Sequence, residues 1–200
     1  TLGTACGGFA SYAFGIWAPT LFARAFDLSL TEANSRYGLP SFAAGITGAL
    51  LLGVACDQLA SKDAWWPFRL AAIGLVGFFT SMFALCFVQD VNVATALCFP
   101  AGLMAGGWVI AMQSALQDLL PAKVRATGTS IWAFALTFSG LALGVLFVGF
   151  ATDILSQRFG PQAIRISMAI TLLPAIPAII LLLMSGQTVQ ADRVSLLKAL

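Results

Sequence analysis

The chain has 200 residues, of which 60% are hydrophobic and only 9% are charged, and its mean hydropathy is +0.93. About a quarter of the residues of a soluble domain are charged, so this composition excludes an ordinary soluble domain and predicts a membrane protein. The net charge of +2 is small and the charges lie between apolar runs, which argues against a nucleic-acid partner.

Six apolar stretches are long enough to cross a bilayer, which takes roughly 20 residues. They lie at about 4–23, 37–57, 68–88, 93–117, 127–152 and 164–184. Transmembrane strands would alternate apolar and polar residues, whereas these stretches are apolar on every face, so the sequence predicts six helices. We expect the bundle to occupy residues 1–185 and a polar cytoplasmic tail to occupy residues 186–200.

The charged residues of the short connections predict the orientation. One side of the membrane collects the basic residues Lys62, Arg69, Lys123, Arg125, Arg193 and Lys198. The other side collects Arg24, Arg36, Arg158 and Arg165. Because basic residues favour the cytoplasmic side, both termini are expected in the cytoplasm. The membrane itself is expected to be a bacterial inner membrane.

One sequence pattern occurs twice. "GALLLGVACDQLASK" (48–62) and "GVLFVGFATDILSQR" (144–158) are related by a constant offset of about 96 residues. The matched pairs are Gly48 and Gly144, Gly53 and Gly149, Ala55 and Ala151, Asp57 and Asp153, Leu59 and Leu155, and Lys62 and Arg158. An odd number of spans separates the copies, so the second three-helix unit would be inverted relative to the first. Inverted repeats are typical of secondary transporters.

Two sets of residues carry a resemblance to a known family. "GVACDQLASK" resembles the loop motif G-x-x-x-D-[RK]-x-G-[RK]-[RK] of the Major Facilitator Superfamily (MFS) through Gly53, Asp57 and Lys62. The segments "FGIWAPTLFARAFDLSLTEA", "LQDLLPAKVRATGTS", "AIRISMAI" and "GQTVQADR" resemble the C-terminal half of its spinster-like branch.

This resemblance implies a fold and a function. The fold would be six transmembrane helices in an inverted 3+3 repeat, half of a twelve-helix carrier. The chain would then be a piece of a longer secondary active transporter, which moves a small organic or lipid-like solute by alternating access. Its partners would be membrane lipid and the missing N-terminal six-helix half, or a second copy of the chain.

The same resemblance assigns gating roles. The carboxylate of Asp57, with Gly53 and Lys62 in its motif, would accept hydrogen bonds from the start of a helix in the opposite half. Lys123 and Arg125 would lie at a helix start that receives the corresponding carboxylate of that half. The alternatives are a solvated helix end in which Asp57 pairs with Lys62, and membrane-surface anchoring by Lys123 and Arg125.

Polar and aromatic residues within the spans are candidates for a substrate cavity, because buried polar groups are costly in a membrane. These candidates are Tyr12, Trp17, Trp108, Gln113, Ser114, Gln117 and Trp132. Hydrogen bonding between helices and anchoring at the interface are the alternative roles. None of the six stretches carries Asp, Glu or His at mid-span, so a proton-coupling carboxylate would belong to the missing half.

An enzyme is not expected. The chain has no histidine, which excludes a serine–histidine protease and an HExxH zinc protease, and its aspartates are too scattered for a phospholipid synthase. The four cysteines lack CxxC spacing and are expected to be packing residues, so no metal or cofactor is predicted. A channel is disfavoured because no pore-loop signature is present. The remaining alternative is a non-transporting six-helix membrane scaffold or a degenerate carrier remnant.

Overall fold

The computed structural model describes the backbone of residues 1–198 and the side chains of residues 1–187, and all the regular structure within this part is helical. The elements are α1 (Leu2–Ala25), α2 (Leu30–Ala60), α3 (Trp66–Phe87), α4 (Val91–Leu119), α5 (Ala122–Thr137), the π-helix η1 (Phe138–Gly144), α6 (Val145–Phe159), the 3₁₀-helix η2 (Gly160–Gln162), α7 (Ala163–Thr171) and α8 (Ala175–Lys198). The prediction of an all-α protein is confirmed.

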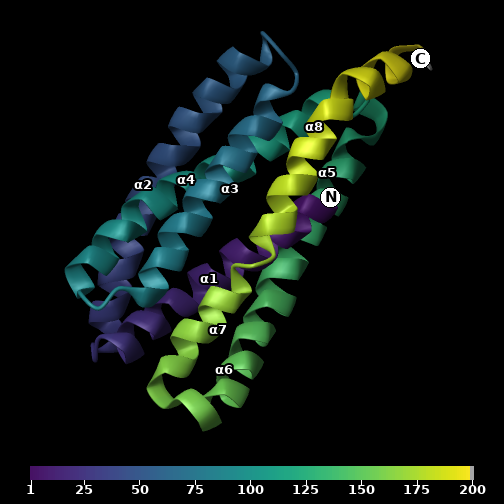
Figure 1. Cartoon of the computed structure of the whole chain (residues 1–200). Coiled ribbons are helices and arrows are strands. Elements are labelled where there is room, and N and C mark those ends of the chain that lie inside the picture. Colours follow the sequence, from purple (N-terminus) through teal and green to yellow (C-terminus); the bar gives the residue numbers. More distant parts are fainter. Residues whose placement is uncertain (199–200) are drawn as a thin grey trace.

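Within the described part of the chain, four stretches are long and apolar enough to cross a membrane: Leu30–Ala60, Trp66–Phe87, Val91–Leu119 and Ala122–Gln187. The last stretch has 66 residues and is not one straight rod, because the chain reverses direction at η2 (Figure 1). The 24-residue helix α1 falls outside this set. The number of six spans and their inverted repeat therefore stay predictions.

The bundle has two ends, which we name after one residue each. The Trp65 end holds the α2–α3 and α4–α5 connections (61–65 and 120–121), and the Arg165 end holds the connections at 26–29 and 88–90 together with η2. The buried side chains form two clusters, one toward each end. Three cysteines, Cys56, Cys86 and Cys98, are fully buried in these clusters, as expected of packing residues.

Helices α2 and α4 approach each other through glycines. A Cβ atom at Gly48 would overlap the backbone of Leu103, and one at Gly102 would lie 2.5 Å from the carbonyl oxygen of Ser41. Gly106 faces the backbone of Gly45 in the same way. Small residues let helix backbones come this close, which is a common basis of helix association in membranes.

A second close crossing joins α1 to η1. A Cβ atom at Gly140 would lie 2.5 Å from the carbonyl oxygen of Gly8. Beside it, the hydroxyl of Ser139 donates a hydrogen bond to the carbonyl oxygen of Ala5 at 2.7 Å, and the indole N–H of Trp17 donates to that of Val145 at 3.1 Å. The helices α5, η1 and α6 follow one another without a break, and we call them the α5–α6 segment (122–159). The irregular turn of the π-helix thus lies where α1 and the α5–α6 segment make their closest contact.

The Arg165 end is closed by one buried cation. The guanidinium of Arg165, in a residue only 6% exposed, donates to the carbonyl oxygens of Cys86 at 2.9 Å, Val88 at 2.8 Å and Ala25 at 3.4 Å. These carbonyls lie at the C-terminal ends of α3 and α1. The last carbonyl groups of a helix have no hydrogen-bond donors further along that helix. Arg165 therefore joins the ends of three helices.

The last helical limb is interrupted at Leu172–Pro174, between α7 and α8. Proline has no N–H and clashes with the preceding turn, which explains the break at Pro174, while Pro177 lies within the first turn of α8, where proline is tolerated. The backbone of α8 continues past the predicted tail boundary at residue 185, and residues 199–200 of that tail lie outside the described residues.

The α2–α4 crossing yields the first prediction. Replacing Gly48 by alanine should destabilise the protein by about 1–3 kcal/mol, because the added methyl group would force α2 away from α4. The matched control is Gly38→Ala in the same helix, where no atom lies within 4 Å of the new methyl group. Because alanine favours helix by up to about 1 kcal/mol over glycine, this control should be neutral or stabilising. Thermal unfolding in detergent measures both, and equal effects would contradict the proposed packing role.

Candidate functional site

Two neighbouring cavities lie at the middle of α1, α2 and α4. One of about 310 Å³ is lined from α2 by Tyr37, Ser41 and Gly45, and the other, of about 320 Å³, is lined by Tyr12 and Trp108. Both cavities are bordered by Ser11, Ala105 and Gly106. The walls are small and mostly apolar, with a few hydroxyl groups, which is the usual character of a site for an organic ligand.

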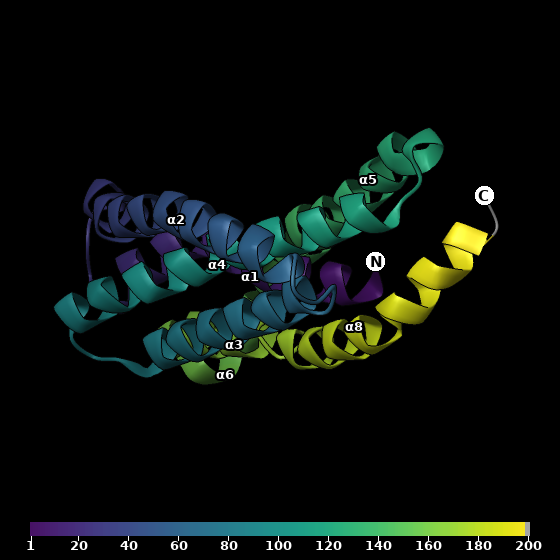
Figure 2. The same cartoon turned by 90° about the horizontal axis from the view of Figure 1, so that it is seen from above.

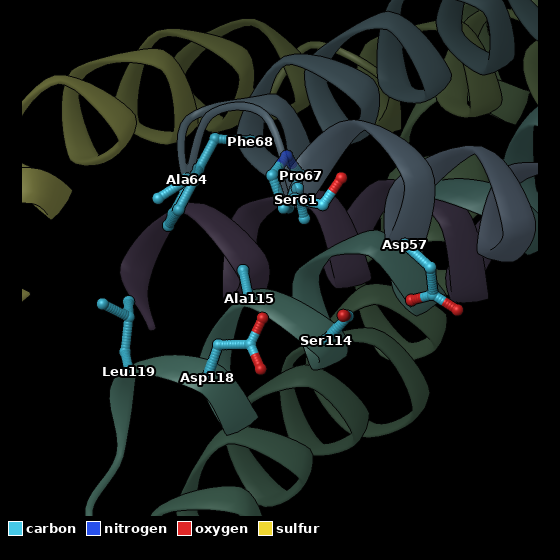
Figure 3. A pocket seen from close by; sticks show the side chains of 10 residues that line it. Asp57, Ser61, Ala64, Pro67, Phe68, Ser114, Ala115, Asp118 and Leu119 are labelled. Carbon is cyan, nitrogen blue, oxygen red and sulfur yellow. The ribbon is translucent and has the colours of Figure 1, made fainter.

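A third cavity, of about 320 Å³, lies at the Trp65 end and carries two carboxylates. Asp57 comes from the last turn of α2 and Asp118 from the last turn of α4, and Ser61 and Ser114 complete its polar lining (Figure 3). Among residues 1–187, neither carboxylate has an ion-pair partner. The carbonyl-rich ends of two helices face the same region, so this cavity favours positive groups.

A wider depression of about 660 Å³ lies where α4 passes into α5. Its polar lining comes from Gln117 on α4 and from Arg125, Thr129 and Ser130 on α5. The guanidinium of Arg125 donates two hydrogen bonds, each 3.3 Å long, to the carbonyl oxygen of Leu120 just after α4. Arg125 therefore fixes the turn between the two helices.

The chain is similar to known proteins both in sequence and in structure. The chain is 28% identical over 163 residues to an MFS-type efflux pump of Mycolicibacterium smegmatis (strain ATCC 700084 / mc(2)155), covering 81% of this chain and 38% of the pump. Its structure matches two crystal structures of a bacterial homologue of the human lysosomal transporter Spinster, both inward-facing, one unoccupied and one occupied. The TM-scores are 0.82 and 0.80, with 20% and 19% identity, and 96% of this chain covers 47% and 49% of those chains. No family model matches the sequence.

The fold is that of half an MFS transporter. The predicted resemblance to the MFS is thereby confirmed, and the apolar helices together with these relatives identify an integral membrane protein. The chain spans less than half the length of each of these relatives.

The structure distributes the predicted cavity residues over several places. Tyr12 and Trp108 meet at the middle cavities, although Trp108 is fully buried there, and Ser114 lines the carboxylate cavity. Gln117 is exposed at the α4–α5 depression, and Gln113, one turn earlier, is half-buried.

The other two aromatic candidates take part in helix packing. Trp17 lies against Gly149 and bonds Val145, and Trp132, 5% exposed, lies in the core cluster of the Trp65 end. The indole N–H groups of Trp108 and Trp132 are buried without a hydrogen-bond partner among the described residues. The seven candidates therefore do not form one cavity in this half, and their roles stay predictions.

The predicted gating residues all lie toward the Trp65 end. Asp57 is exposed in the carboxylate cavity. A Cβ atom at Gly53, one turn earlier, would lie 3.6 Å from the side chain of Ile110. Lys62 is exposed after α2, and among residues 1–187 it forms no ion pair with Asp57. Lys123 is exposed in the first turn of α5.

Sequence reasoning missed several polar residues of these cavities, among them Asp118, Ser11 and Ser41. Asp118 shares the cavity of Asp57, and the signal that found Asp57, a carboxylate at the end of an apolar run, applies to it equally. Ser11 and Ser41 line the middle cavities, and nothing in the sequence separates them from other hydroxyl residues of the spans.

Removing the charge of an aspartate should shift the unfolding temperature in opposite directions at the two kinds of helix end. Asp57→Asn and Asp118→Asn should each raise the unfolding midpoint by about 1–4 °C, because a negative charge near a helix C-terminus is unfavourable. Asp90→Asn should lower it by a similar amount, since Asp90 lies at the N-cap of α4, where a negative charge is favourable, and asparagine keeps the hydrogen bond from the N–H of Asn92 (2.7 Å) but loses the charge.

The measurement is thermal unfolding of the purified chain in detergent at low and at 1 M salt. Salt screening should shrink all three differences. Shifts of the same sign for all three variants would show that these carboxylates do not act through the helix ends.

Proposed function

We propose that the chain is the C-terminal half of a secondary active transporter that moves a small organic or amphiphilic solute by alternating access. The observation that carries this proposal is the pair of cavities at the middle of α1, α2 and α4. Half-buried Ser11, Tyr12 and Ala105 border these cavities, so a second bundle placed against this face would enclose a solute. Substrate sites of this transporter class lie near the bilayer midplane, between repeats.

Packing contacts support an inverted 3+3 repeat of α1–α3 and α4–α8. Gly48 lies against the backbone of Leu103 on α4, and its repeat partner Gly144 lies against the backbone of Phe9 on α1. Thus the second helix of each proposed unit packs through a glycine on the first helix of the other. The two glycine-bearing stretches also run toward opposite ends, which is the relation that an inverted repeat requires.

The partner in this proposal is the N-terminal six-helix half, or a second copy of this chain. The relatives are about twice the length of the chain or longer, which supports the first choice. We place the transporter in a bacterial inner membrane with the Trp65 end and both termini in the cytoplasm, as the distribution of basic residues predicts.

The carboxylate cavity would then be the cytoplasmic gate. Asp57 and Asp118 face a region that favours positive groups, such as the N-terminal end of a helix in the other half. That contact would form when the inside is closed and break when it opens. Lys123 and Arg125, across the α4–α5 turn, would receive the matching carboxylate of the other half.

Transport can be tested with inverted or right-side-out membrane vesicles and a panel of fluorescent amphiphilic solutes. Vesicles with the protein should show saturable, gradient-dependent transport of at least one solute. Ala105→Trp should reduce this transport to the level of empty vesicles, because Ala105 borders both middle cavities. The matched control is Ala84→Trp on α3, an exposed alanine outside these cavities, which should transport normally. Transport that does not saturate, or that survives Ala105→Trp, would favour the scaffold.

The native polypeptide should be longer than the 20.9 kDa of this chain. An immunoblot of native membranes with an antibody against residues 185–200 should reveal a band at about twice that mass, as the duplicated bundle of such carriers implies. A band near 20.9 kDa would leave a homodimer as the transporting form, and chemical cross-linking in the same membranes would then have to show that dimer.

A further inference from the structure

A fourth cavity lies on the outer face of the bundle, between α3 and α8. These helices run side by side in both views (Figure 1, Figure 2). The cavity has a volume of about 450 Å³ and is lined by Trp66, Arg69, Ala72, Ile73, Val76, Ile179 and Leu183. Arg69 is the charged residue of this lining, and the other side chains are apolar or aromatic.

Arg69 is held in place by two tryptophans. Its guanidinium carbon lies 3.8 Å from the centre of the Trp65 ring and 5.3 Å from that of Trp66, at distances typical of cation–π stacking. Trp65 lies directly on Gly186 of α8, where any side chain would overlap its indole ring. The stack therefore depends on the close approach of α8 to the start of α3.

The N–H groups of Arg69 remain available for a ligand. Among residues 1–187, the side chain of Arg69 has no hydrogen-bond or ion-pair partner, and the residue is only partly buried. Stacking occupies the faces of a guanidinium and leaves its edge free to donate two parallel hydrogen bonds. That edge matches a phosphate group.

The charge and the apolar lining are separated along the helix axis. Arg69 lies in the first turn of α3, while Val76 lies seven residues deeper, a distance of about 10 Å at 1.5 Å per residue. Ile73 and Val76 are 55% and 44% exposed, and Leu183 and Ile179 follow the same depth order on α8. A positive group at the membrane surface thus leads into an apolar groove within the membrane.

We propose that this groove binds one anionic phospholipid. The phosphate lies on the edge of the Arg69 guanidinium, the head group lies at the level of the two tryptophans, and one acyl chain lies in the groove between α3 and α8. A basic residue at the membrane surface attracts anionic lipid, and tryptophan is enriched at that depth. The bound lipid would bridge α3 and α8 on the face opposite to the proposed partner half.

Native mass spectrometry of the full chain tests the head-group contact. The probes are dioleoyl phosphatidylglycerol and dioleoyl phosphatidylcholine, which have identical acyl chains and differ in net charge. The chain should bind phosphatidylglycerol more tightly, and Arg69→Gln should weaken this binding about fivefold, the effect expected for one basic residue at an anionic surface. The matched control is Arg158→Gln, an exposed arginine 5.7 Å from the ring of Phe159 but outside the groove, which should leave the affinity unchanged.

A second pair of variants tests the acyl-chain contact. Ile73→Trp should weaken the binding of both lipids by filling the groove, whereas Ile154→Trp should not, although these isoleucines are similarly exposed, at 55% and 54%. Arg69→Lys should keep most of the selectivity and so separate loss of charge from loss of folding, which circular dichroism also monitors. Equal affinity for the two lipids, unchanged binding by Arg69→Gln, or displacement of the lipid by free glycerol phosphate would overturn the proposal.

Discussion

Direct contact between helix backbones at glycines is the constraint on which this bundle depends. Lipid is as apolar as a helix surface, so burial from water cannot drive these helices together, and close packing has to do so. The two closest crossings are Gly48 against Leu103 and Gly140 against Gly8. They join α2 to α4 and α1 to the α5–α6 segment. The middle cavities lie between the helices that these two crossings position.

Backbone carbonyls at helix ends set a second constraint, because an unpaired polar group is costly away from water. At one end of the bundle, Arg165 satisfies the last carbonyls of two helices without any carboxylate among the described residues as its partner. A lysine would replace it poorly, since Arg165 reaches its three acceptors from two separate nitrogens, whereas a lysine carries all its donors on one. The helices at this end are thereby fixed relative to one another by contacts within the chain.

The sequence predicted the helices and their connections well, because apolar runs and the prolines and charges between them are local features. It also found Asp57, which ends such a run. It did not predict the role of Arg165, whose acceptors are 77 to 140 residues away in the chain, and treated it only as a surface charge. Nor could it separate Trp132, which is buried in the core, from a cavity wall, since both environments favour aromatic residues within a span.

The two ends of the bundle therefore differ in how completely the chain satisfies its own polar groups. At the Arg165 end, a buried cation closes the helix ends from within. At the Trp65 end, Asp57 and Asp118 lie near the negative ends of two helices, an arrangement that costs stability and that no partner among the described residues offsets. A proposed second bundle would offset this cost only when it contacts that end. In the proposed transporter, the strength of that contact would bias the equilibrium between closed and open states at the Trp65 end, while the Arg165 end would move as a rigid unit.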